Sequence, residues 1–149
     1  MASRRLFRGL RCTFTPVVVA LTAATGGIVA ACPAPRAGFY GVAQAAQGKT
    51  VFDQQCASCH KADLSGDAGP PLAGAQFLAW LQFTHITGSQ LLAFISSQMP
   101  YNTPGSLTKA QYQDVFSYIL SVNGYPAGAT PLDAQSAGCV EMLPYPKQH

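Results

Sequence analysis

The spacing of apolar positions after about residue 46 predicts a small all-α domain. A first helix is expected over residues 47–56, because Gly48, Phe52 and Cys56 follow one another at intervals of four and share one helical face. The strongest pattern belongs to the last expected helix, whose apolar positions are Tyr112, Val115, Phe116, Ile119 and Leu120.

Capping sequences and a proline set the limits of the later helices. Thr87 and Thr108 each stand three residues before a glutamine, which is the spacing of a capping box at the start of a helix. Pro100 ends the helix that begins at Thr87, since proline disfavours a helical conformation in the residue before it. Residues 75–83 form a further short apolar stretch, and residues 61–74 are a loop rich in Gly, Pro and Asp.

The first 45 residues have the composition of an export segment. Four arginines precede a low-charge run over residues 14–31, and this order is typical of a signal peptide. The run is short and rich in Gly, Thr and Ala for a membrane span, so an uncleaved anchor is the alternative. Cleavage is expected after Ala43-Gln44-Ala45. A second candidate is Val29-Ala30-Ala31-Cys32, which resembles a lipoprotein sequence with Cys32 as the lipidated residue.

These features predict three parts: an export segment over residues 1–45, a domain over residues 46–128 and a tail over residues 129–149. The tail has no periodicity and is expected to drape over the domain or to stay mobile. Of the five cysteines, Cys12 and Cys32 are expected to leave with the export segment. Cys139 is expected to remain as an unpaired thiol, with intermolecular pairing as the alternative.

Loss of the export segment changes the sign of the charge. All five arginines lie at or before residue 36, and four lysines and six acidic residues follow residue 45, a formal charge of 4 − 6 = −2. The domain therefore has no basic patch, and nucleic-acid binding is not expected.

One short motif carries the chemistry of the chain. Residues 56–60 read Cys-Ala-Ser-Cys-His, the spacing of covalent c-type haem attachment. On one helical turn Cys56 and Cys59 lie on the same face, so both thiols can reach the vinyl groups of one porphyrin, and His60 can offer an imidazole nitrogen to the iron. A bare Cys-x-x-Cys would also fit zinc or disulfide exchange. The adjoining histidine favours haem, and the single motif predicts one haem.

A haem held by one histidine needs a second axial ligand or leaves an open site for small molecules. The candidates after residue 45 are Met99, Met142, His85 and His149. Met99 precedes Pro100 in a segment rich in proline and glycine, which can hold a thioether in place, and a thioether raises the reduction potential of the iron. Ordinary core packing is the alternative for Met99. Trp80 is either core or a donor to a haem propionate through its indole N–H.

Together these motifs resemble the class I monohaem cytochromes c over about residues 47–128. Gly48, Phe52 and residues 56–60 are similar to the first helix and haem motif of that family, and residues 69–72 (Gly-Pro-Pro-Leu) match its Gly-Pro-x-Leu loop. The resemblance implies a small cytochrome c fold, with three to four helices around one covalent haem and with crossing N- and C-terminal helices.

The same resemblance implies the ligands of the iron. Met99-Pro100 matches the distal ligand of the family, so His60 and Met99 would be the two axial ligands. The carbonyl of Pro70 would accept the other ring N–H of His60 and so orient it. Tyr118 matches the aromatic residue of the final helix. The expected haem-binding set is Cys56, Cys59, His60, Met99, Pro70 and Trp80.

A narrower resemblance concerns the partners. Residues 99–107 and 118–128 look similar to cytochrome subunits and domains that work with quinoprotein (PQQ-type) dehydrogenases. This implies a dehydrogenase as electron donor, and another cytochrome or a terminal oxidase as acceptor. The expected function is one-electron transfer in the periplasm, by a carrier that is not itself an enzyme or by a subunit of a dehydrogenase complex. Peripheral or lipid-anchored membrane association is an alternative to a free carrier.

Two rival functions stay open at this point. In the first, Met99 does not bind the iron, and the protein is a haem-based sensor or a small-ligand binding module. In the second, residues 56–60 bind no haem and form a redox-active or zinc-binding Cys-x-x-Cys site.

Overall fold

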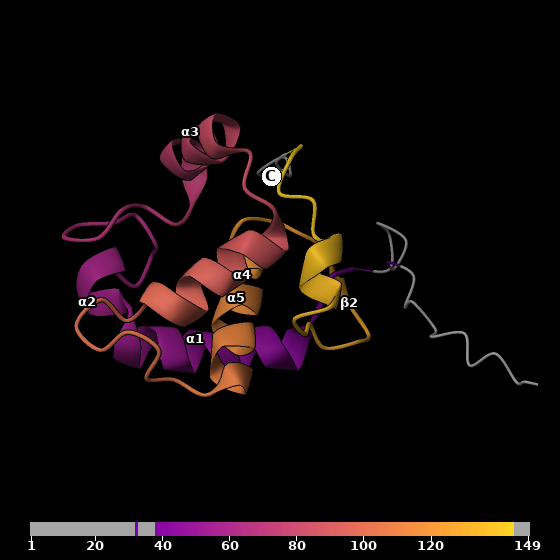
Figure 1. The fold of residues 1–149 in the computed structure, drawn as a ribbon, viewed down its shortest axis with the longest axis horizontal. Coiled ribbons are helices and arrows are strands. Elements are labelled where there is room, and N and C mark those ends of the chain that lie inside the picture. The colour runs from indigo at the N-terminus through magenta and orange to yellow at the C-terminus, as the bar shows by residue number, and fades with distance from the viewer. Residues whose placement is uncertain (1–31, 33–37, 145–149) are drawn as a thin grey trace, which may run out of the picture. The chain divides into compact units, whose positions relative to one another are not determined.

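The computed structural model describes residue 32 and residues 38–144. Helices dominate this part of the chain, and the expected all-α class is confirmed (Figure 1). In chain order the elements are β1 (Tyr40–Gly41), α1 (Val42–Gln55), α2 (Ala57–His60), α3 (Gly74–Thr84), α4 (Gly88–Gln98), α5 (Lys109–Val122), β2 (Ala127–Gly128) and the 3-10 helix η2 (Ser136–Cys139). Among the residues described, no helix combines the length and the apolar character needed to cross a membrane.

The local signals for α4 and α5 are confirmed. Thr87 and Thr108 are the N-cap residues, and both capping boxes form with Gln90 and Gln111. In each box the threonine oxygen accepts from the glutamine backbone N–H, at 3.2 Å in both helices. Four residues therefore fix two helix starts through bonds that are local in sequence.

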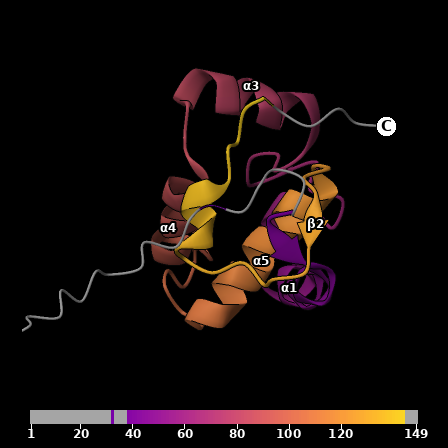
Figure 2. The ribbon, with the colours of Figure 1, turned by 90° about the vertical axis from the view of Figure 1, so that its right-hand side faces the viewer.

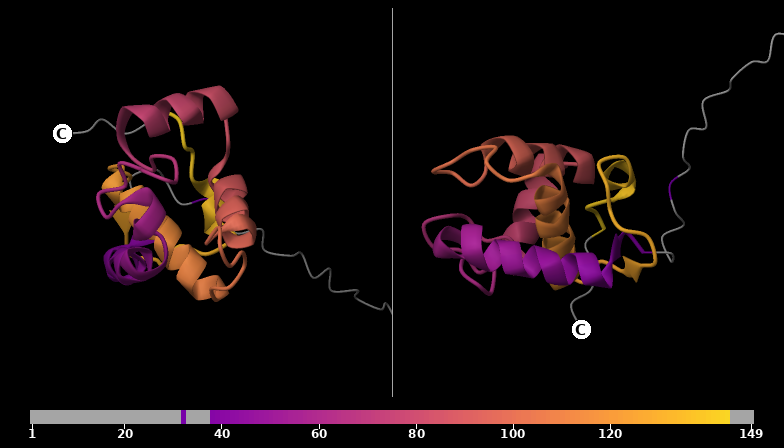
Figure 3. Two further views of the ribbon diagram at one scale, coloured as in Figure 1. Left: turned by 90° about the vertical axis from the view of Figure 1, so that its left-hand side faces the viewer. Right: turned by 90° about the horizontal axis from the view of Figure 1, so that it is seen from below.

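Helices α1 and α5 pack closely where they cross, as the view from below in Figure 3 shows. Gly48 of α1 is buried, and a Cβ atom there would overlap the backbone carbonyl of Asp114 in α5. Beside this contact the ring of Phe52 meets the ring of Tyr118 edge-on, with centroids 5.4 Å apart. The crossing that the resemblance implied is present. It requires glycine at position 48, because a side chain there would overlap the backbone of α5.

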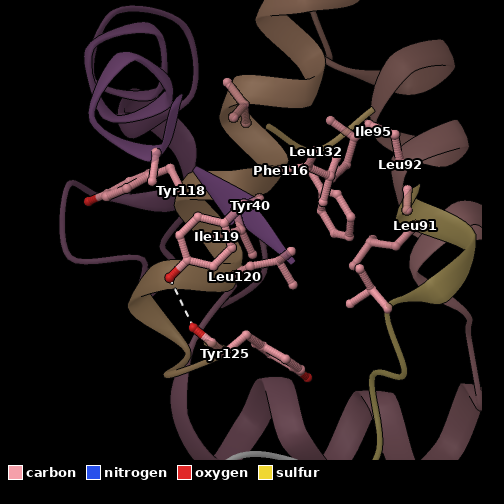
Figure 4. Close-up of a cluster of buried hydrophobic side chains, with 14 of the residues drawn as sticks. Tyr40, Leu91, Leu92, Ile95, Phe116, Tyr118, Ile119, Leu120, Tyr125 and Leu132 are labelled. Atoms are coloured by element: carbon pink, nitrogen blue, oxygen red, sulfur yellow. Dashed lines mark hydrogen bonds between the residues drawn. The ribbon is translucent and has the colours of Figure 1, made fainter. Parts of the chain in front are cut away.

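The core lies between α5 and α4 and continues toward the C-terminal segment (Figure 4). Phe116, Ile119 and Leu120 of α5 are buried there with Leu91 and Leu92 of α4. In contrast, α3 stands apart from the layer formed by α1 and α5, and the chain after η2 runs toward it (Figure 2). This arrangement leaves one side of α3 facing the rest of the domain across a space that side chains only partly fill.

The folded part begins before the expected limit at residue 46. Residue 45 lies inside α1, and Ala45 itself is buried. Upstream of it, β1 pairs in parallel with β2, and the buried Tyr40 donates from its hydroxyl to the carbonyl of Tyr125 at 2.9 Å. Cleavage after Ala45 would remove these contacts and the first turn of α1, so the structure places the domain boundary further toward the N-terminus.

The folded part also extends past the expected limit at residue 128. Four apolar side chains of the tail are buried, namely Leu132, Ala137, Val140 and Met142. Gln44 of α1 holds the backbone of Leu132 through two hydrogen bonds, of 2.8 and 2.7 Å. The tail as far as residue 144 therefore packs against the domain, as one of the two expected alternatives stated.

A disulfide between Cys32 and Cys139 corrects the expected cysteine roles, and the two Cα atoms are 5.3 Å apart. Cys139 is not an unpaired thiol, and Cys32 is covalently part of the folded domain. A sulfur bonded to Cys139 cannot also carry a lipid, so lipidation at Cys32 does not fit this structure. Periodicity gave no signal for this bond, because it joins residues 107 positions apart.

Candidate functional site

The described residues enclose a cavity with a volume of about 720 Å³. It lies beside the space between α3 and the rest of the domain, and α1, α2, α3, α4, α5, residues 70–72 and residues 99–102 all contribute to its wall. The wall includes all six expected haem-binding residues: Cys56, Cys59, His60, Pro70, Trp80 and Met99. The fold therefore brings together residues that lie up to 43 positions apart in the sequence.

The motif residues reach this cavity because the chain turns at Cys56. Helix α1 ends at Gln55, and the short α2 begins immediately after Cys56. The carbonyl of Cys56 accepts from the backbone N–H groups of Cys59 and His60, at 3.1 and 3.0 Å. One tight turn thus brings Cys56, Cys59 and His60 to the wall of a single cavity.

Two side chains of the motif are withdrawn from solvent, His60 fully and Cys56 in part. His60 is buried, with 7% of its surface exposed. Burial, with a smaller contribution from neighbouring Cys59, raises the pKa of Cys56 to about 11. The thiol of Cys56 is therefore protonated at neutral pH.

The loop after α2 fixes the orientation of His60. The Nδ1 atom of His60 lies 2.7 Å from the carbonyl oxygen of Pro70, which is the contact that the resemblance implied. Because a carbonyl oxygen can only accept, Nδ1 carries the proton and the lone pair is on Nε2. A Cβ atom at Gly69 would lie 2.7 Å from the ring of His60, so the loop can pass this close only without a side chain there.

Met99 is held by its backbone at the C-terminal end of α4. Its N–H donates to the carbonyl of Ile95 at 3.1 Å. Its carbonyl accepts from the hydroxyl of the buried Tyr112 at 2.6 Å and from the N–H of Gly105 at 3.2 Å. Helix α5 therefore anchors the segment that carries Met99.

Tyr112 is a residue whose role sequence reasoning missed. Its place on the apolar face of α5 predicted only a core side chain, and its ring is indeed buried. The polar hydroxyl on an apolar face was the available signal, because a buried tyrosine hydroxyl requires a hydrogen-bond partner.

Two other candidates for a second axial ligand, His85 and Met142, do not line the cavity. His85 is exposed after the end of α3, in a left-handed conformation. Met142 is buried in the tail, where its carbonyl accepts from Tyr125. His149 lies outside the described residues. Among the described candidates, Met99 alone shares the cavity with His60.

Trp80 lies at the edge of the cavity. It is 39% exposed, and its indole stacks on Phe77 with the ring centroids 5.9 Å apart. This position is compatible with either expected role, and the donor role toward a propionate stays a prediction.

The fold and this site define a domain of the cytochrome c class. Residues 43–119 match the model of the family described as cytochrome C oxidase, cbb3-type, subunit III, and the chain belongs to this family.

Two further comparisons show where similar domains occur. The chain is 36% identical over 95 residues to thiosulfate dehydrogenase of Stutzerimonas stutzeri (strain A1501), covering 60% of this chain and 29% of that protein. It also resembles the crystal structure of the sulfane dehydrogenase SoxCD from Paracoccus pantotrophus, with a TM-score of 0.54 and 20% identity over 75% of this chain and 60% of that one. The second likeness concerns the fold alone. Neither of these two proteins is named as a quinoprotein, so the expected partnership with a quinoprotein dehydrogenase stays a prediction.

Proposed function

We propose that this protein carries single electrons by means of one covalently bound haem c, with His60 and Met99 as the axial ligands. One observation carries the proposal: Cys56, Cys59, His60 and Met99 all line one cavity. Membership of a cytochrome c family supports electron transfer as the general role.

The residues around the cavity fit a haem group. A volume of about 720 Å³ lies in the range of sites that enclose a cofactor. Apolar side chains such as Phe52, Phe77, Leu91 and Ile95 line it, as a porphyrin requires. The hydrogen bond to Pro70 leaves Nε2 of His60 with the lone pair that an iron ligand needs.

Each residue has a defined task in this proposal. Haem c, when bound, supplies an iron that alternates between the ferrous and ferric forms and so carries one electron. Cys56 and Cys59 would hold the group through thioether bonds, and Pro70 keeps His60 in one tautomer and orientation. The soft thioether of Met99 favours the ferrous form and raises the reduction potential.

The disulfide and the N-terminal composition support a periplasmic location for the carrier. Disulfides persist in oxidising compartments such as the periplasm, and Cys32–Cys139 is of this kind. The basic and apolar N-terminal segment supports export, with processing upstream of Cys32.

We infer that a dehydrogenase is the donor, of the quinoprotein type or acting on sulfur compounds as the relatives do. Another cytochrome or a terminal oxidase would be the acceptor. The enzymatic activity of thiosulfate dehydrogenase is that protein's own, and this chain spans 29% of its length.

A pyridine haemochrome assay tests the covalent attachment. The full chain is produced in a bacterial host that attaches c-type haem, and the expected result is one haem per polypeptide that resists acid–acetone extraction. The Cys56→Ser/Cys59→Ser double variant should retain no haem after the same extraction. Wild-type protein without covalent haem would contradict the proposal. Rapid binding of carbon monoxide by the reduced wild-type protein would favour the sensor or ligand-binding function instead.

Replacement of Tyr112 by phenylalanine should weaken the hold on Met99 without loss of haem. The variant removes the hydrogen bond to the Met99 carbonyl and the longer one, of 3.3 Å, that the hydroxyl accepts from the N–H of Leu107. The bond to Met99 is worth about 1 kcal/mol, which corresponds to a roughly fivefold change in an equilibrium constant. We expect imidazole to displace Met99 from ferric iron at about fivefold lower concentration, as followed by visible absorption. Tyr118→Phe is the matched control, because it removes a hydroxyl from the same helix away from Met99. An equal imidazole affinity in the two variants would show that Tyr112 is only a core residue.

A further inference from the structure

A fully buried polar side chain lies at the C-terminal end of α5, far from the motif in the sequence. Asn123 is 0% exposed, and it caps the helix with its backbone, because its N–H donates to the carbonyl of Ile119 at 3.2 Å. Burial of an amide group is costly unless its hydrogen bonds are satisfied. The partners of the Asn123 side chain therefore decide what this residue does.

The side-chain amide of Asn123 joins the end of α5 to the loop that follows the motif. Its Nδ2 atom donates to the carbonyl of Leu72 at 2.8 Å and to the carbonyl of Ile119 at 2.8 Å. The first bond connects residues 51 positions apart, whereas the second stays at the end of the helix. Because a carbonyl oxygen can only accept, both bonds fix the direction in which the amide nitrogen points.

Leu72 ends the short span of chain whose carbonyl orients His60. Residues 70–71, both proline, have no backbone N–H, so the span between them cannot donate hydrogen bonds of its own. Its position therefore depends on how its two ends are held. At the first end the N–H of Gly69 donates to the carbonyl of Cys59 at 2.9 Å, which ties the span to the motif itself.

The second end, at Leu72, is held from two directions. The N–H of Leu72 donates to the carbonyl of the buried Leu64 at 2.9 Å, and its own carbonyl accepts from Asn123. The bond from Asn123 comes from α5, so it fixes the span relative to the core of the domain. Two residues before Leu72, the carbonyl of Pro70 lies 2.7 Å from Nδ1 of His60. A shift at Leu72 would therefore change the contact with His60.

We propose that Asn123 is a positioning residue for His60, because by holding Leu72 it keeps the carbonyl of Pro70 against the imidazole ring. This inference rests on the proposed function, since it concerns the strength of His60 as an iron ligand. A hydrogen bond from Nδ1–H to a carbonyl raises the basicity of the ligating nitrogen. A more basic ligand favours ferric iron, so Asn123 lowers the reduction potential although it does not line the cavity.

The test compares Asn123→Ala with Ser117→Ala in the holoprotein. Ser117 of α5 is also 0% exposed, and its hydroxyl donates to the carbonyl of Gln113 at 2.8 Å, within the same helix. Both variants truncate a fully buried polar side chain to alanine, and Asn123→Ala alone removes the bond to Leu72. A pyridine haemochrome assay first measures covalent haem in both variants and in the wild type.

Spectroelectrochemical titration then gives the reduction potentials. In Asn123→Ala the ferrous form should be favoured about fivefold more than in wild type, which raises the potential by about 40 mV, at roughly 59 mV per tenfold change for one electron. Ser117→Ala should change this ratio by less than about 1.5-fold, or about 10 mV. Equal potentials in the two variants, or a lower potential in Asn123→Ala than in wild type, would overturn the proposal.

Hydrogen exchange of the Nδ1 proton of His60, followed by NMR of the ferrous holoprotein, measures the hydrogen bond to Pro70 itself. This proton should exchange about tenfold faster in Asn123→Ala than in Ser117→Ala, because the span loses one of its anchoring bonds. The backbone amides of α1 should differ between the two variants by less than about twofold. If all of these protons exchange faster by the same factor, Asn123 only stabilises the fold and the proposal is overturned.

If Asn123→Ala retains no covalent haem, the wild-type protein alone decides. One opening of the span would release both the side-chain amide of Asn123 and the Nδ1 proton of His60, so exchange of the two should depend equally on denaturant concentration. Exchange of the Nδ1 proton while the Asn123 amide stays protected would overturn the proposal. Wild-type protein without covalent haem would instead contradict the proposed function, so the two failures are distinguishable.

Discussion

Replacement of Cys139 by serine should lower the free energy of unfolding of the holoprotein by about 2–5 kcal/mol. The disulfide to Cys32 closes a loop between residues 107 positions apart, and so it restricts the unfolded chain strongly. In the folded protein it also secures the end of η2, next to Ala137 and Val140, which pack against the start of α4 at Gly88. Chemical denaturation followed by far-ultraviolet circular dichroism measures the effect.

Reduction provides the control for this prediction. Wild-type protein in a thiol reductant should unfold at the same denaturant concentration as the Cys139→Ser variant, because thioether bonds to haem resist the reductant. The variant itself should not respond to reductant. Equal stability of oxidised wild type and variant would show that the disulfide does not hold the fold.

Replacement of Gly48 by alanine should lower the free energy of unfolding by about 2 kcal/mol, which is an overpacking cost of about 3 kcal/mol less a gain of about 1 kcal/mol in helix propensity. Helix propensity alone favours alanine over glycine by about 1 kcal/mol, so the sign of the effect distinguishes packing from propensity. A Cβ atom at this position would overlap the carbonyl of Asp114, which is backbone and cannot rotate away. The two helices must then separate, and overpacking of this kind costs about 1–3 kcal/mol or more.

Gln47→Ala is the matched control, because Gln47 is exposed on the same helix one residue earlier. Its free energy of unfolding should stay within about 0.5 kcal/mol of wild type, measured by the same denaturation. If Gly48→Ala is as stable as this control or more stable, the α1–α5 contact is looser than described.

Features set by neighbouring residues could be predicted from the sequence. The capping boxes at Thr87 and Thr108 formed as expected, and the apolar stretch over residues 75–83 became α3 with a shift of one residue at each end. The start of α1 was predicted five residues too late. Its N-cap is Gly41, which has no side chain that could make a capping bond, so the sequence contained no marker for that end.

Features set by distant residues could not be predicted from periodicity. The disulfide joins segments from opposite ends of the chain, and the buried tail residues around Val140 have no helical or alternating pattern. The bond from Tyr112 to Met99 spans 13 positions and two elements. The site itself was easier to predict, because Cys56, Cys59 and His60 are fixed by one turn of chain and the remaining residues came from a family resemblance.

Visible absorption of the ferric holoprotein tests the central claim most directly, namely that Met99 is the second axial ligand opposite His60. The wild-type protein should show the weak absorption band characteristic of methionine ligation. Met99→Leu should lose this band and bind carbon monoxide readily when reduced, whereas Met142→Leu should retain the band. The claim is contradicted if wild-type protein with covalent haem lacks the band, or if Met99→Leu retains it.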